Sequence, residues 1–359
     1  MKVDIVIAVA ERGGVENVIC DTAIYLKSSG WKVRIIQLVW EGFCWTPSDI
    51  SFFPLLYGRS GHNLAELIEA YQLFIQSEEA PDVILATGWP YISYLTRKAL
   101  VYGNKSAKII SWLHAPVNRY QQAGYGGYDA LNYADAHFAI SDTIYQEIYK
   151  TISTNVFRVY NPVDFSKCPK LKLSDNVLQK KIAYVGRISP EKHIEIILEA
   201  LLYLDKEWNM DIVGTGDAQL ENMLKRKIKK WGINNRVNWL GWKKNPWMDE
   251  DNTAEIVVLA SEYEGSPLTV IEAMACGKTV ISTPVDGIKE LIVHGESGYL
   301  FEYGNARMLS EILNALEKGM LPVIDKSICK SKVANFEKGI ALKNFENILF
   351  QYTVEGEKK

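Results

Sequence analysis

Two glutamates stand eight positions apart in one short segment of this 359-residue chain. Residues 261–277 read S-E-Y-E-G-S-P-L-T-V-I-E-A-M-A-C-G, with Glu264 in a Gly-Ser-Pro loop and Glu272 two helical turns later. Glu272 lies among apolar residues typical of a core, where a carboxylate without a partner is costly. Two interpretations stay open. Either Glu264 caps the helix and Glu272 is a partnered interior acid, or both acids belong to a ligand site.

Two cations follow a candidate strand in the second half of the chain. Arg187 and Lys192 lie in Y-V-G-R-I-S-P-E-K-H, residues 184–193. Ligands of doubly wound sheets bind outside the carboxyl ends of the strands. An arginine fork and a lysine point charge at such an end suit a diphosphate. The alternative is a pair of solvated surface charges.

Two glycine motifs follow strands but lack the complete dinucleotide fingerprint. Gly13 and Gly14 precede a helix start, where backbone N–H groups can approach an anion. Gly214 begins G-T-G-D-A-Q, in which Gln219 stands where a third glycine belongs. A plain strand-to-helix turn explains Gly13-Gly14 equally well, and a tight turn is the preferred explanation of the second motif. The missing glycines argue against a nicotinamide-dependent oxidoreductase.

Short apolar strands alternate with helical patterns along the whole chain. Several of them, such as I-V-I-A-V and E-I-V-V-L, have a continuous apolar run rather than an alternating pattern, which is typical of parallel strands covered on both faces. The alternation predicts an α/β protein with two doubly wound domains. The seam is expected at 161–176, which contains two prolines and no clear periodicity. The expected strands are 3–8, 32–38, 82–86, 108–113, 136–140, 156–160, 181–185, 210–213, 236–240, 255–259 and 278–282.

The motifs, taken in order, resemble one enzyme family. V-G-R-x-x-P-x-K, then G-x-G-D, then E-G-x-x-x-x-x-x-E-A-x-A-x-G are similar to the retaining glycosyltransferases of family 4. G-G-V-E near the N-terminus, the strand ending in His114 and Asn161-Pro162 also match. N-W-L-G-W-K-K-N-P-W, followed by the two-glutamate segment, looks closest to lipopolysaccharide-core galactosyltransferases. The resemblance covers about residues 1–320.

The resemblance implies a GT-B fold, in which two Rossmann-like domains face a cleft. Residues 1–165 would form the acceptor-side domain and residues 177–330 the nucleotide-sugar domain. Residues 331–359 would form a C-terminal helix that packs back on the first domain.

The resemblance also assigns roles to the motif residues. Glu264 would bind the donor sugar and Glu272 the nucleotide ribose, while Arg187 and Lys192 would neutralise the leaving diphosphate. His114 would face the transferred sugar near its 6-hydroxyl, although a structural histidine at a strand end is the alternative. The remaining nucleotide-sugar contacts would come from Gly13, Gly14, Gly214, Gly241, Trp242 and the amides of Leu268 and Thr269. Pro267 stands where many members have glycine and removes one N–H donor.

The expected reaction is transfer of a hexose, galactose or glucose, from a UDP-sugar with retention of configuration. The acceptor would be a glycan or a lipid-linked glycan in cell-surface polysaccharide or glycoconjugate synthesis. No separate cofactor and no metal are expected, because Asp249–Asp251 is a D-x-D in a charged loop without its usual sheet context. The alternative is a non-catalytic partner subunit of the same fold, although such subunits tend to lose the donor-site charges.

Three further segments allow two interpretations each. The aromatic stretch 40–57 and the Gly/Tyr segment 116–128 after His114 suit an acceptor sugar, or else form core and a disordered connection. The basic run 224–230 suits an anionic membrane surface, or else is the solvated face of a helix.

Composition excludes several other classes of protein. The net charge of −3 offers no electrostatic basis for binding nucleic acid. Five scattered cysteines without a C-x-x-C argue against a disulfide framework or a zinc site. No stretch reaches the roughly 20 apolar residues of a membrane span, and the N-terminus resembles a buried strand more than a signal peptide. We therefore expect a cytoplasmic protein, with peripheral contact to the inner membrane surface.

Overall fold

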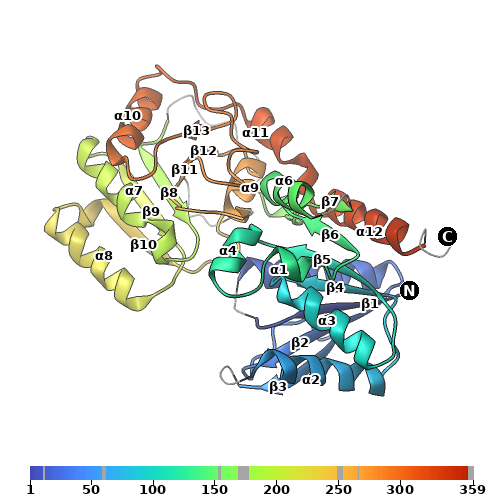
Figure 1. The fold of residues 1–359 in the computed structure, drawn as a ribbon. Helices are drawn as coiled ribbons and strands as arrows, with labels where there is room; N and C mark the ends of the chain where they lie inside the picture. Colours follow the sequence, from blue (N-terminus) through green and yellow to red (C-terminus); the bar gives the residue numbers. More distant parts are fainter. Residues whose placement is uncertain are drawn as a thin grey trace. The chain divides into compact units, whose positions relative to one another are not determined.

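The computed structural model describes residues 1–10, 13–58, 62–152, 155–168, 178–248, 254–265 and 267–354. The chain divides into two compact units (Figure 1). The first unit contains Met1–Pro162 and the C-terminal residues from Gly339, and the second contains Val163–Lys338. Each unit is built around one fully parallel sheet, as the continuous apolar strands predict.

The first unit contains a seven-stranded sheet in the order β3-β2-β1-β4-β5-β6-β7. The direction in which strands are added reverses between β1 and β4, so these two strands flank the topological switch point. Ligands of doubly wound folds bind beside that point, at the carboxyl ends of the strands. The strands are β1 (Lys2–Ile7), β2 (Lys32–Trp40), β3 (Ser51–Tyr57), β4 (Val83–Thr87), β5 (Lys108–Leu113), β6 (Ala136–Ala139) and β7 (Val156–Arg158).

Helices cover the sheet of the first unit and bury its apolar strands. One face packs against α2 and α3, whose buried side chains join those of β1, β2 and β4 in a single core cluster. The helices are α1 (Gly14–Ser28), α2 (Leu64–Ser77), α3 (Tyr91–Tyr102), α4 (Val117–Gln122), α5 (Tyr128–Leu131), α6 (Asp142–Thr151) and α12 (Lys338–Val354).

The C-terminal helix α12 belongs to the first unit although it is last in sequence. Phe345 is 2% exposed, and its ring lies 5.0 Å from that of Trp112 on β5 and 4.9 Å from that of Phe138 on β6. The indole of Trp31 donates to Glu346 at 3.1 Å, and the hydroxyl of Tyr352 donates to the carbonyl of Asp135 at 2.6 Å. This helix therefore covers β5 and β6.

The segment expected as 331–359 is divided between the two units, and the second unit begins before residue 165. The amide of Val163 donates to the carbonyl of Phe336 at 2.8 Å, and that of Lys338 donates to Val163 at 2.9 Å. These bonds tie together the two points at which the chain passes between units. Because they join residues more than 170 positions apart, local sequence patterns do not reveal them.

The second unit contains a six-stranded sheet in the order β10-β9-β8-β11-β12-β13. Its switch point lies between β8 and β11. The strands are β8 (Lys181–Val185), β9 (Asn209–Val213), β10 (Val237–Gly241), β11 (Ile256–Leu259), β12 (Thr279–Ser282) and β13 (Tyr299–Leu300). The helices are α7 (Ile194–Ala200), α8 (Ala218–Lys230), α9 (Leu268–Ala275), α10 (Ala306–Glu317) and α11 (Lys326–Lys332).

Two strands were not expected from the sequence. β3 falls in the aromatic stretch 40–57 and pairs only with β2, at one edge of its sheet. Its Pro54 weakens the strand pattern, although proline is tolerated at a sheet edge. β13 has only two residues, which is too short to leave a periodic signal.

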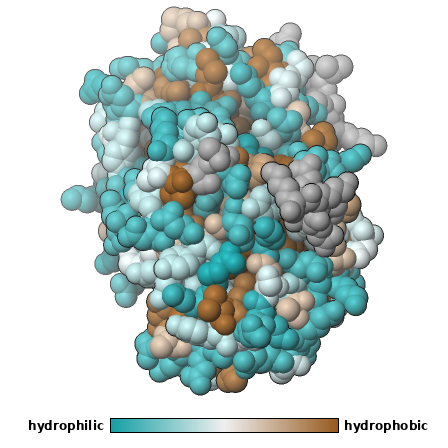
Figure 2. Space-filling model, turned by 45° about the vertical axis from the view of Figure 1, so that its right-hand side comes forward, coloured by the Kyte–Doolittle hydropathy of each residue, from teal (hydrophilic) through white to brown (hydrophobic). Residues whose placement is uncertain are grey.

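Among the described residues, no helix combines the length and the apolar content needed to cross a bilayer. The face of the molecule in Figure 2 is mainly hydrophilic, with hydrophobic residues in small separate patches. Such scattered apolar residues are ordinary for a protein surface.

Candidate functional site

In the second unit, several predicted residues gather at the switch point of the sheet. Arg187 and Lys192 follow β8, whereas Glu264 follows β11, and β8 and β11 are paired neighbours. The two connecting segments are also joined directly, because the amide of Glu262 donates to the carbonyl of Glu191 at 2.9 Å. The sheet thus brings together residues 72 positions apart at the place where this fold binds ligands.

Lys192 and Glu264 form the closest charged contact of this site. Lys192 Nζ lies 2.5 Å from Glu264 Oε1, and the two side chains are 18% and 12% exposed. The hydroxyl of Ser261 donates to the same oxygen at 2.7 Å. Both bonds end on Oε1, so neither uses Oε2 of Glu264. The pair holds an ammonium group and a carboxylate in fixed positions at the strand ends.

Arg187 lies in the same segment as Lys192 but is much more exposed. Its side chain is 60% exposed, and its Nη2 lies 3.4 Å from Glu191 Oε1. Burial acts to raise the pKa of Glu191, but the Ser189 hydroxyl and the charges of Arg187 and Lys192 lower it overall. Glu191 therefore stays ionised, and each cation of the site already has a carboxylate partner.

The first turn of α9 presents backbone amides at the same sheet edge. Pro267 is the N-cap residue, and its carbonyl accepts from the amides of Val270 and Ile271. The amides of Leu268 and Thr269 have no hydrogen-bond partner among the described residues, which exclude Ser266. Amides at a helix start favour a bound anion.

Glu272 has the partner that its apolar neighbours require. The indole nitrogen of Trp247 donates to Glu272 Oε2 at 2.8 Å, and Trp247 is 5% exposed. Burial raises the pKa of Glu272, while the Trp247 bond opposes that rise. The structure thus supplies a partner for an interior acid, and it leaves the ribose role of Glu272 a prediction.

Gly214 and Gly241 are needed for close approach and turning of the backbone. A Cβ on Gly214 would lie 1.9 Å from the carbonyl oxygen of Gly186, and the amide of Gly214 donates to Gly241 at 2.8 Å. Gly241 has a φ of +68° at the end of β10. Trp242, the next residue, is 69% exposed. A structural role therefore explains both glycines, and their contact with a nucleotide stays a prediction.

In the first unit, the Gly13-Gly14 segment follows β1 and starts α1. The amide of Gly13 donates to Glu16 Oε2 at 3.1 Å, and Glu16 is 8% exposed. This bond occupies the Gly13 amide and puts a carboxylate where an anion was expected. It favours the interpretation as a strand-to-helix turn. Glu11 and Arg12 lie outside the described residues.

His114 directly follows the last residue of β5 and is 9% exposed. Its ring lies 4.9 Å from that of Trp112 and is tilted by 45°. Burial lowers the pKa of His114 to about 3, so the imidazole is neutral at physiological pH. Its Nε2 has no hydrogen-bond partner among the described residues. A neutral imidazole can donate or accept a hydrogen bond, but it carries no positive charge.

Several neighbours of these residues were not identified as site residues from sequence. Ser261 and Trp247 hold the two glutamates, and Glu191 holds Arg187. All three residues stand in or beside the sequence motifs described above. Trp247, however, lies 25 positions from Glu272, so no spacing rule could pair these two residues. Trp89 and Tyr125 also stack beside the strand ends of the first unit.

No group of three or more histidine, cysteine, aspartate or glutamate side chains in the described part of the chain could hold a metal ion. The predicted solvated loop at Asp249–Asp251 lies outside the described residues.

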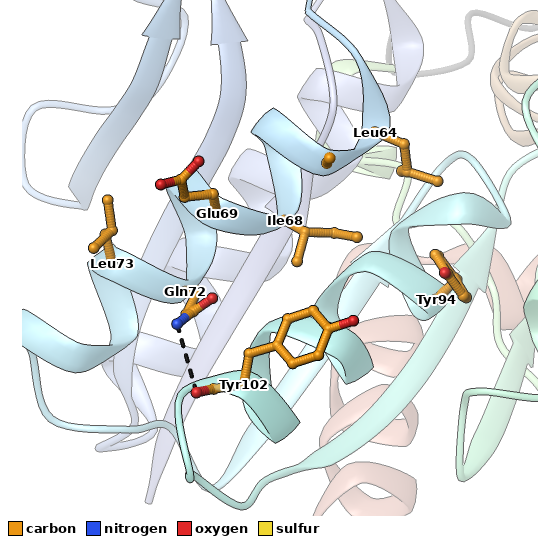
Figure 3. Close-up of a pocket in the computed structure, with 8 residues that line it drawn as sticks. Leu64, Ile68, Glu69, Gln72, Leu73, Tyr94 and Tyr102 are labelled. Carbon is orange, nitrogen blue, oxygen red and sulfur yellow. Dashed lines mark hydrogen bonds between the residues drawn. The ribbon is translucent and has the colours of Figure 1, made fainter.

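A cavity of about 570 Å³ lies between α2 and α3 of the first unit. Figure 3 shows Tyr94 and Tyr102 on α3 facing Ile68 and Gln72 on α2. None of the predicted site residues lines this cavity.

The chain is similar to known protein families and to known proteins. Residues 12–167 match the family model "Glycosyltransferase Family 4", and residues 172–323 match "Glycosyl transferases group 1". The lipopolysaccharide 1,6-galactosyltransferase of Salmonella typhimurium LT2 is 28% identical over 282 residues, covering 76% of each chain. The enzyme of the same name from Escherichia coli K12 is 25% identical, over 74% of this chain and 72% of that protein.

Solved structures share the fold over nearly the whole chain. The apo form of the lipopolysaccharide outer core galactosyltransferase WaaB has a TM-score of 0.79 at 23% identity, over 98% of this chain and all of that one. Anabaena HepE in complex with UDP and glucose has a TM-score of 0.76 at 18% identity, over 97% and 99%.

Proposed function

The chain belongs to the family 4 glycosyltransferases of the GT-B fold, and we propose that it transfers galactose or glucose from a UDP-sugar. The acceptor would be a glycan or a lipid-linked glycan in cell-surface polysaccharide or glycoconjugate synthesis. The observation that carries the proposal is the Lys192–Glu264 pair at the switch point of the second unit.

Each residue of that switch point has a task in the proposed reaction. Lys192 and Arg187 stabilise the negative charge that develops on the departing diphosphate, together with the amides of Leu268 and Thr269. Glu264 binds donor sugar hydroxyls through Oε2, since Lys192 and Ser261 occupy Oε1. Glu272 binds the ribose hydroxyls while Trp247 fixes its carboxylate.

The proposed transfer retains the anomeric configuration without a metal ion. Neutral His114 contributes a hydrogen bond near the sugar 6-hydroxyl and is not the nucleophile. A same-face displacement follows, in which the leaving phosphate helps to accept the proton of the acceptor hydroxyl. The cations of the second unit take the role of a metal at the diphosphate. An anomeric assignment of the product by NMR and an assay in EDTA test both points.

The galactosyltransferase relatives support galactose as the donor sugar, and the UDP and glucose bound to HepE support a UDP-linked hexose. The deciding experiment measures UDP release from UDP-galactose, UDP-glucose and their N-acetylated counterparts. Each donor is assayed alone, with methyl hexopyranosides and with core lipo-oligosaccharide. We expect a UDP-hexose to be the best donor. Release from none of them contradicts the proposal.

The Lys192–Glu264 pair provides the sharpest mutational test. The variant Lys192→Ala removes the cation that stabilises the diphosphate of the donor, and Glu264→Gln removes the carboxylate that binds the sugar hydroxyls. We expect either change to lower the rate of transfer by about 100-fold or more. The fold is checked by circular dichroism, and replacement of the exposed Lys206→Ala is the matched control. Transfer near the wild-type rate in either site variant would exclude that residue from the reaction.

The competing hypothesis is a non-catalytic partner subunit. A non-catalytic subunit would bind UDP in calorimetry, but it would neither transfer the sugar of any donor nor hydrolyse any donor slowly. The presence of Arg187, Lys192, Glu264 and Glu272 supports an enzyme.

We also propose that α8 mediates peripheral contact with an anionic membrane. Five cations occupy residues 225–230, and only Lys225 has a carboxylate within ion-pair distance among the described residues, namely Glu221 at 3.5 Å. Lys225 and Lys227 lie over the rings of Trp239 and Trp231, at 4.8 and 4.9 Å. Four of the five cations thus have no carboxylate partner in the described part of the chain, and cations beside tryptophans suit a negatively charged lipid surface.

Vesicle sedimentation tests this contact. Each cation near an anionic surface contributes about 1 kcal/mol, so reversing Arg226, Lys229 and Lys230 to Glu should weaken binding to phosphatidylglycerol-containing vesicles by about 100-fold or more. Reversal of the exposed Lys206, Lys318 and Lys343 is the charge-matched control. Equal loss in both triple variants, or equal binding to pure phosphatidylcholine, would contradict a role of α8.

A further inference from the structure

An aromatic stack lies at the strand ends of the first unit. The rings of Trp89 and Tyr125 have centroids 4.1 Å apart and an interplanar angle of 5°. Trp89 follows the end of β4 by two residues, and Tyr125 lies in the Gly/Tyr segment after His114. Tyr125 is 39% exposed, so part of this residue is open to solvent.

The stack stands beside the switch point of its sheet. β4 is one of the two strands that flank the point, and β5, which leads to His114, is the next strand. The amide of Gly88 donates to the carbonyl of Trp112 at 3.0 Å, which joins the ends of β4 and β5. Trp89 and His114 therefore leave neighbouring strands at the edge where doubly wound sheets bind ligands.

Backbone bonds hold Tyr125 in place on both sides. Its amide donates to the carbonyl of Tyr120 at 2.9 Å, and its carbonyl accepts from Tyr91 at 3.2 Å. Gly126 has a φ of +95°, and a Cβ there would lie 2.9 Å from the Tyr91 nitrogen. The ring is thus ordered before any ligand binds, which lowers the entropy cost of binding.

The start of α4 is also anchored, which orders the rest of this segment. Glu147 on α6 accepts from the amides of Val117 and Asn118, at 2.8 and 3.1 Å, and from the hydroxyl of Tyr128 at 2.7 Å. A disordered connection, one of the two interpretations of residues 116–128, is therefore not observed, and this segment is structured and carries exposed amide side chains. These are Asn118, Gln121 and Gln122.

We propose that Trp89 and Tyr125 form a platform on which a pyranose ring of the acceptor stacks. The inference rests on the proposed function and names the acceptor-binding residues of the first unit. The C–H bonds of a pyranose face carry slight positive charge, which suits the negative face of an aromatic ring. The exposed amides of α4 can hydrogen-bond the hydroxyls at the rim of the sugar. The solvent-facing side of Tyr125 receives the sugar, because Trp89 covers the other side.

Saturation-transfer NMR on the full chain, with methyl galactopyranosides and methyl glucopyranosides as probes, tests the platform. We expect saturation of the pyranose ring protons by the wild type and by Tyr125→Phe, which keeps the ring face. We expect loss of the signal in Tyr125→Ala and Tyr125→Leu. Tyr102→Ala is the control, because Tyr102 is 60% exposed and lies at the C-terminal end of α3, whereas Trp89 precedes the N-terminal end. This variant should keep the signal.

Kinetics provide a second readout. With core lipo-oligosaccharide as acceptor, Tyr125→Ala should raise the KM for the acceptor by about three- to tenfold, the range of an aromatic contact. Donor hydrolysis and the Kd for UDP should stay unchanged. Pyranoside signals that are absent in the wild type or intact in Tyr125→Ala overturn the platform, as does a weaker Kd for UDP. A wild-type chain that neither binds nor hydrolyses any UDP-sugar overturns the proposed function instead.

Discussion

At the scale of single residues, the candidate site consists of charges that are already paired. Lys192 lies against Glu264 and Arg187 against Glu191, so the four charges cancel in the structure described here. An incoming diphosphate would have to share cations that carboxylates now hold. This arrangement keeps the ammonium of Lys192 oriented, and it means that removing one partner also leaves a half-buried charge unpaired. Activity and stability must therefore be measured together in these variants.

Two buried histidines of the first unit link its stability to pH. Burial lowers the pKa of His137 to about 4 and that of His114 to about 3. In the unfolded chain a histidine titrates near 6.5, so the unfolded state binds the proton first as the pH falls. Each contribution is therefore complete above about pH 6.5 and is lost progressively as the pH falls toward the folded pKa.

The pH prediction concerns His137, whose Nδ1 lies 2.7 Å from the hydroxyl of Ser111. Between pH 7 and pH 5 we expect His137 to account for roughly 2 kcal/mol of lost unfolding free energy. Urea unfolding followed by tryptophan fluorescence measures it. The variant His137→Gln should lose correspondingly less stability on acidification, whatever its stability at pH 7. Parallel pH dependence in the variant and the wild type would show that His137 does not titrate this way.

At the scale of elements, the segments that follow the strands position the site residues. The segments after β8 and β9 are in direct contact. The segment after β8 runs beside the segment after β9, where Ile188 bridges to Gly216. A Cβ on Gly214 or on Gly216 would lie within 2 Å of a carbonyl oxygen of the β8 connection. The G-x-G motif thus allows the segment that carries Arg187 and Lys192 to lie against its neighbour.

The variant Gly214→Ala should therefore be strongly destabilised. The clash with the Gly186 carbonyl and a φ of +142° together predict a loss of about 3–5 kcal/mol. Chemical denaturation measures the loss. Gly232→Ala is the matched control, because Gly232 has a φ of +71° with open space around its Cβ position and should lose only about 1–2 kcal/mol. Equal losses in both variants would show that the close approach is unimportant.

At the scale of the whole molecule, the first unit is completed by the end of the chain. The chain leaves this unit after Pro162 and returns at Gly339. Helix α12 then covers β5 and β6, with Phe345 against Trp112 and Phe138. The strand that leads to His114 therefore depends on residues more than 220 positions away.

The variant Phe345→Ala tests this dependence. Loss of a fully packed aromatic ring should cost the first unit about 3–5 kcal/mol. Phe350→Ala on the same helix is the control, since Phe350 is 50% exposed and should change stability by no more than about 0.5 kcal/mol. Thermal unfolding of the full chain compares the two. Similar stability of both variants would mean that α12 adds little to the first unit.

The sequence by itself determined the architecture and the ordered motifs of this protein. Mainly apolar runs such as 181–185 and 108–113 predicted parallel strands, and both strands are observed with those bounds. Runs of this kind are recognisable because a strand buried on both faces has apolar residues at nearly every position. The sequence also singled out Lys192, which follows a strand end, and the resemblance singled out Glu264. The roles of both residues stay predictions.

Only the tertiary structure decided which distant residues meet. Lys192 touches Glu264, Trp247 holds Glu272, and Trp89 stacks on Tyr125 across separations of 72, 25 and 36 positions. The edge strand β3 also belongs to this group. The resemblance implied that the C-terminal helix packs back on the first domain, but only the structure decided that α12 covers β5 and β6. Such contacts depend on how the parallel strands are ordered in each sheet, and the spacing of residues along the chain does not predict that order.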